Sequence, residues 1–71
     1  MKRLAYAVII EPIPEHEGGG FLASVPDLPG CMTDAETPEK ALEAAQGVID
    51  EWIEEAVRLG RSVPQPTKRV A

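Results

Sequence analysis

The chain has little sulfur and little imidazole: Cys31 is the one cysteine and His16 the one histidine among its 71 residues. A single cysteine excludes an internal disulfide. This pair is also too small a ligand set for the zinc sites that proteins build from nitrogen and sulfur, so we expect no bound metal. A lone thiol suits a reducing compartment, and we expect the protein in the cytoplasm.

Long apolar runs are missing as well. No stretch approaches the roughly 20 apolar residues that a helix needs to span a bilayer. The apolar run 4–10 is short and lacks the small-residue cleavage site of a signal peptide. We therefore expect no membrane segment. A chain of this size buries only about 60% of the surface that its unfolded form exposes, and self-association is the route to further stability that the composition leaves open.

Basic residues are in the minority, since 7 Lys and Arg against 12 Asp and Glu give a net charge of −5. Nucleic-acid binding draws most of its affinity from neutralised phosphates, so this balance disfavours it. A basic partner protein fits the sign of the charge better. The simpler interpretation is that modest acidity keeps a small protein in solution.

The groups that could do chemistry are scattered along the chain. Nucleophilic catalysis requires Ser, Cys or Thr beside an oriented base. His16 lies between two glutamates in a loop rich in Pro and Gly, and neither Ser24 nor Cys31 has a base nearby in the sequence. The run 18–20 is three glycines without the lysine and the helix start of a phosphate-binding loop. We expect no catalytic residue and no cofactor.

Three β-forming apolar segments occupy residues 3–11, 20–25 and 31–35. The connections between them are short and carry Gly and Pro, so consecutive strands should pair antiparallel as a meander. The longer connection, residues 12–20, contains two prolines and the three glycines, and it predicts a mobile surface loop.

From residue 38 the apolar residues recur at spacings of three and four, which is the period of an amphipathic helix. Thr37 suits the N-cap and Pro38 the first helical position. Gly60 suits the stop. The pattern predicts a helix over about 38–59, packed on one face of the sheet.

Residues 63–71 contain two prolines and are either a short edge strand or a frayed tail. We therefore predict one α+β domain over residues 1–71. Its order is β-β-β-α-β, a three-stranded antiparallel meander with one long helix and a possible fourth strand.

Two surfaces are candidates for binding. One is the helix face opposite the apolar stripe, and its carboxylates are Glu43, Asp50, Glu51 and Glu54. Such a face is usually only solvated, and the functional alternative is a docking surface for a basic partner. The other is the second side of the first strand, which carries Ala5, Ala7 and Ile9. One helix covers one side of a sheet, so we expect these residues to mediate a homodimer or a larger symmetric oligomer.

One compact motif stands between the second and third strands: Pro26, Asp27, Leu28, Pro29, Gly30 and Cys31. With the flanking segments 6–11, 20–25, 37–42 and 60–66, it resembles the HicB-like antitoxin family over nearly the whole chain. The resemblance implies a partial RNase H-like fold. It also implies binding and neutralisation of a small basic toxin of the HicA type that cleaves mRNA.

The resemblance has two limits. Many members append a helix-turn-helix or ribbon-helix-helix module that binds operator DNA. Only residues 61–71 follow Gly60 here, so we do not infer DNA binding from the resemblance. An RNase H-type active site needs an aspartate in the middle of the first strand, where residues 4–10 have no carboxylate. We therefore expect that the protein is not an enzyme. The alternatives are a stand-alone oligomeric binding module and a metal-dependent nuclease.

Overall fold

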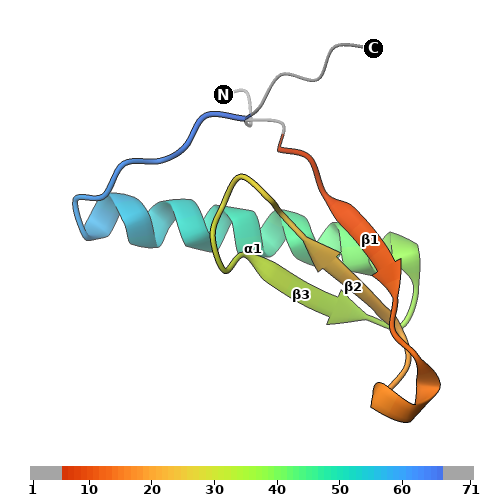
Figure 1. The fold of residues 1–71 in the computed structure, drawn as a ribbon. Coiled ribbons are helices and arrows are strands. Elements are labelled where there is room, and N and C mark those ends of the chain that lie inside the picture. The colour runs from red at the N-terminus through yellow and green to blue at the C-terminus, as the bar shows by residue number, and fades with distance from the viewer. Residues whose placement is uncertain (1–5, 67–71) are drawn as a thin grey trace.

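Three strands, a 3-10 turn and one helix make up the regular structure of residues 6–66, which the computed structural model describes (Figure 1). In chain order the elements are β1 (Ile9–Pro12), the 3-10 turn (Glu15–Glu17), β2 (Phe21–Ser24), β3 (Met32–Ala35) and α1 (Pro38–Arg58). The sheet has the strand order β1-β2-β3 with both pairs antiparallel. The predicted α+β meander with one long helix is confirmed.

The helix lies on a single face of the sheet, where small side chains let the two come close. Ala23 of β2 and Ala41 of α1 are fully buried, and Ala45 packs beside them. A second cluster contains Leu28, Ile49 and Tyr6 and continues the core toward the β2–β3 connection. The core is therefore a thin layer between α1 and the sheet.

Both ends of α1 are capped as the sequence predicts. The Thr37 side-chain oxygen accepts a hydrogen bond from the Lys40 backbone N–H at 3.1 Å. At the other end Gly60 has φ +72°, its N–H bonds to the Val57 carbonyl, and the Arg61 N–H bonds to the Ala56 carbonyl at 2.8 Å. This pair of bonds is a Schellman motif. The helix ends at Arg58, one residue before the predicted last helical residue, Leu59.

The first strand is shorter than predicted. It begins at Ile9, and residues 6–8 are in no strand, while residues 3–5 lie outside the described part. Ile9 pairs with Ser24, the last residue of β2. Beyond Ser24 no β2 residue remains to pair, because the Val25 N–H bonds to the Cys31 carbonyl inside the turn.

The structure describes all of the predicted loop 12–20 and only the first part of the predicted strand or tail 63–71. The connection 12–20 contains a defined turn, in which the Pro14 carbonyl accepts hydrogen bonds from the N–H groups of Glu17 and Gly19. At the C-terminal end, residues 63–66 are in no strand, and the rest of the predicted fourth strand lies outside the described residues. The Tyr6 hydroxyl donates to the Pro64 carbonyl at 2.5 Å, so this segment returns to the start of the sheet (Figure 1).

Within residues 6–66, no helix has both the length and the apolar character that crossing a bilayer requires.

Two neighbouring glycines allow a test of the β2 start. Gly19 and Gly20 both have positive φ, at +71° and +81°, but a Cβ at Gly20 would lie 2.7 Å from the Ala35 carbonyl oxygen, whereas one at Gly19 meets nothing within 4 Å. Gly19→Ala should lower the free energy of unfolding by about 1 kcal/mol through backbone strain alone. Gly20→Ala should lower it by at least roughly twice that, because the β3 backbone must also shift. Equal losses in urea denaturation would contradict this packing.

Candidate functional site

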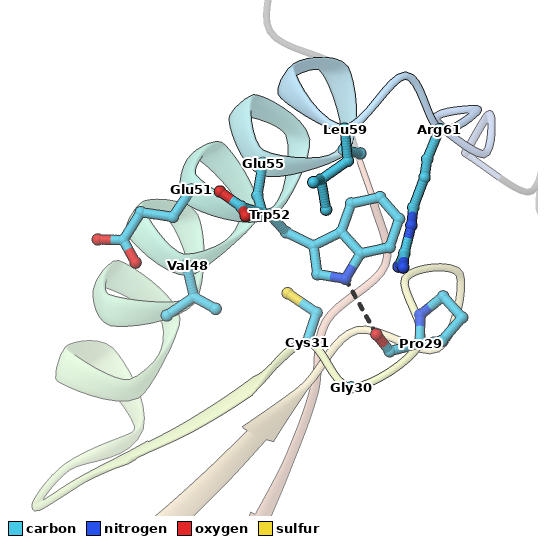
Figure 2. Close-up of a pocket in the computed structure, with 10 residues that line it drawn as sticks. Pro29, Gly30, Cys31, Val48, Glu51, Trp52, Glu55, Leu59 and Arg61 are labelled. Carbon is cyan, nitrogen blue, oxygen red and sulfur yellow. Dashed lines mark hydrogen bonds between the residues drawn. The ribbon is translucent and has the colours of Figure 1, made fainter.

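An open groove runs between the C-terminal half of α1 and the connection from β2 to β3 (Figure 2). Its volume is about 550 Å³. The apolar part of its lining consists of Cys31, Val48, Trp52, Ala56 and Leu59. Pro29 and Gly30 form the wall opposite the helix. We call this the α1–turn groove.

Trp52 is at the centre of this groove. Its indole Nε1 donates a hydrogen bond to the Pro29 carbonyl at 2.9 Å, shown as the dashed line in Figure 2. The bond ties the turn to the helix and satisfies the one polar group of the ring. The side chain is half-buried, so part of the ring surface stays open to the groove.

The groove exists because α1 is longer than the sheet it covers. Twenty-one helical residues span about 31 Å, while strands of four residues span about 13 Å. The C-terminal turns of α1 therefore extend past the strands (Figure 1). On these turns Leu59 is 50% exposed and Val57 is 66% exposed.

Charges of both signs surround the groove. Glu51 and Glu55 line it from the helix, and Arg61 lines it from beyond the helix end. Glu55 forms an ion pair with Arg58, whose Nε lies 3.1 Å from one carboxylate oxygen. Glu51 is exposed and has no ion-pair partner within the described residues.

The four carboxylates predicted as a docking surface lie along one flank of α1. Glu43, Glu51 and Glu54 are exposed, and Asp50 is half-buried. Only Glu51 also lines the α1–turn groove. We call these four residues the acidic flank.

The side of the sheet away from α1 has no covering element among residues 6–66. Ile9 is 44% exposed and Met32 is 56% exposed. They pair with the same β2 residue, Ser24, and therefore lie in one row, next to Leu22. We call Ile9, Leu22 and Met32 the outer sheet face. Of the residues predicted for self-association, Ile9 is on this face, Ala7 is half-buried and Ala5 lies outside the described residues.

The chain matches a known protein family. Residues 6–70 match the family model described as the HicB-like antitoxin of bacterial toxin–antitoxin systems. The chain belongs to this family. The match covers more than half of the chain, including all three strands and α1.

Three relatives illustrate the range of the family. The chain is 36% identical over 66 residues to UPF0150 protein ssl0259 of Synechocystis, covering 93% of this chain and 86% of that one. It is 33% identical over 66 residues to Antitoxin HicB 1 of Photorhabdus laumondii, covering 93% of this chain but 41% of that protein. It is 32% identical over 62 residues to UPF0150 protein Ta0767 of Thermoplasma acidophilum, covering 87% and 86%.

The motif by which the sequence resembles HicB-like antitoxins is a structural turn. Leu28, in the middle of the motif, and Cys31, at its end, are buried at 1% and 2% exposure, and they anchor the turn in the core. The Cys31 N–H bonds to the Leu28 carbonyl at 3.0 Å. Pro26, Pro29 and Gly30 are exposed, and Asp27 is half-buried. The motif thus places the wall of the α1–turn groove.

The groove itself was missed by sequence reasoning. Trp52 lies within the segment whose apolar spacing predicts the helix, but no local pattern indicates that its indole reaches the turn carbonyl. The available signal was the continuation of the stripe to Leu59, past the part of the helix that four-residue strands can cover.

The remaining candidates for chemistry stay apart from one another. His16 is exposed and lies 3.4 Å from Glu17, and Ser24 is half-buried in β2. Across residues 6–66, no three His, Cys, Asp or Glu side chains are grouped so that they could hold a metal ion.

Cys31 should behave as an inert thiol. Burial raises its pKa above the ordinary value of 9.0. At pH 8 the native protein should therefore react with iodoacetamide at least about tenfold more slowly than the same chain in urea, because the thiolate is the nucleophile. The folded state should also lose stability as the pH rises above 9.0, since the unfolded thiol ionises first. Equal alkylation rates in both states would contradict the burial of Cys31.

Proposed function

We propose that this HicB-like antitoxin binds a small, basic, mRNA-cleaving toxin of the HicA type and neutralises it by covering its active surface. The acidic flank carries the proposal: α1 has no Lys or Arg between Lys40 and Arg58, and its carboxylates are displayed on an exposed face. The antitoxin would act in the cytoplasm, where mRNA is translated, and it would contribute no chemistry of its own.

The mechanism rests on charge and shape. A toxin that binds RNA needs a cationic surface to neutralise phosphates. The acidic flank offers the same surface a protein ligand of the required sign, which speeds encounter and selects the partner. Once bound, the antitoxin excludes RNA by occupying the space that RNA needs.

Co-expression with the small basic protein encoded by the neighbouring reading frame tests this function. The antitoxin should rescue growth and should co-purify with the toxin. Absence of such a reading frame, or growth arrest despite full antitoxin expression, would contradict the proposal.

The same experiment tests the acidic flank through the double variant Glu43→Lys/Glu54→Lys. Its association rate with the toxin should fall on the order of tenfold at low salt and should depend less on salt, because steering by the flank is lost. The matched control is Glu15→Lys/Glu17→Lys, which makes the same charge change in the exposed 3-10 turn. Equal effects of the two variants would remove the flank from the mechanism.

We also propose that the protein forms a homodimer through the outer sheet face. One row of this face is Ile9, Ser24 and Met32, and the neighbouring row holds Leu22 between the carboxylates of Glu11 and Asp34. Two copies in opposite orientations can bury Ile9 and Met32 against each other while keeping their carboxylates apart. The acidic flank has four carboxylates and this face has two, so a basic toxin fits the flank better and a second copy is the better occupant here.

Met32→Glu tests this dimer. In analytical ultracentrifugation at micromolar concentration the wild-type protein should sediment as a dimer and Met32→Glu as a monomer, because a charge would be buried without a partner. The control is Val57→Glu, which changes another exposed apolar residue, on α1 at the opposite face of the sheet. This variant should remain dimeric. A monomeric wild-type protein would contradict the proposal.

A further inference from the structure

The α1–turn groove combines features that the acidic flank lacks. It is concave and its lining is mostly apolar, and it shares one exposed carboxylate, Glu51, with the flank. Interfaces draw most of their binding energy from a few apolar or aromatic anchors in a central pocket, and charged rims contribute little to it. A toxin bound by charge alone would have no such anchor on the antitoxin, and the groove provides one.

The indole of Trp52 gives the groove a fixed shape. Its bond to the Pro29 carbonyl holds the turn against α1, so the walls are set before any partner arrives. Leu59 and Val48 line the groove along the same side of the helix (Figure 2). A preorganised apolar site of this kind loses little conformational freedom on binding.

The charges indicate which molecule fits there. A second copy of the chain carries a net charge of −5 and would meet Glu51 with the wrong sign. A basic protein meets Glu51 favourably, because Glu55 is already neutralised by Arg58 and Arg61 lies on the opposite side of Trp52 from Glu51 (Figure 2). The fitting occupant is a segment that places an apolar side chain over Trp52 and a Lys or Arg beside Glu51.

We infer that the α1–turn groove is the anchor site for the toxin, receiving an apolar side chain and an adjacent cation from it. The inference rests on the proposed antitoxin function and assigns different kinetic roles to the two surfaces. The acidic flank governs how fast the complex forms, and the groove governs how long it lasts.

Leu59→Gln and Val57→Gln form a matched pair for the test. Both residues are at least half exposed near the end of α1, both changes are neutral, and only Leu59 lines the groove. The partner is the basic protein of the neighbouring reading frame, released from the co-purified complex with denaturant and refolded. Leu59→Gln should raise its dissociation rate at least tenfold, and Val57→Gln should change it less than twofold.

A second measurement reads the groove directly. Trp52 is the one tryptophan in the chain, so the isotope-labelled antitoxin has a single indole N–H signal in its NMR spectrum. Saturation with unlabelled toxin should shift this signal. An unchanged indole signal, or equal dissociation rates for Leu59→Gln and Val57→Gln, would overturn the groove while leaving the antitoxin function intact. Failure of the wild-type chain to bind the toxin at all would overturn both.

Discussion

Close contact between α1 and one face of the sheet is the constraint from which the other features follow. Ala23 and Ala41 leave no side-chain bulk between helix and strand, so the core is thin. One helix packed on one face leaves the other face of the sheet uncovered, and strands of about 13 Å cannot cover a helix of about 31 Å along its whole length. The last turns of α1 project past the sheet, and the second face of the sheet stays uncovered among the described residues.

These two uncovered regions differ in chemistry, and we propose a different partner for each. The projecting part of α1 faces the β2–β3 turn across a groove with a carboxylate at its wall, which favours a basic protein. The outer sheet face exposes Ile9 and Met32 on either side of Ser24, which favours a copy of itself in this proposal. The proposed antitoxin would thereby use the surface that its core leaves exposed.

The sequence predicted most of the fold because its signals were local. Thr37 and Gly60 mark the ends of α1 by their own hydrogen-bonding and backbone preferences, and both roles are confirmed. The predicted length of β1 was too long. A strand extends only as far as its partner does, and β2 ends at Ser24. The groove depends on a contact between Trp52 and Pro29, 23 positions apart, and no local pattern encodes that contact. The acidic flank was visible from spacing, but its role as a docking surface stays a prediction.

We propose that neutralisation is occlusion, with the antitoxin bound and both proteins chemically unchanged. This can be measured by titrating the antitoxin into a toxin-catalysed RNA cleavage reaction and recording the intact masses of both proteins at the end. Activity should fall in proportion to added antitoxin, reach zero at one antitoxin chain per toxin, and return when the toxin is separated and refolded. Complete inhibition by a small fraction of an equivalent, or a toxin of altered mass, would rule out occlusion.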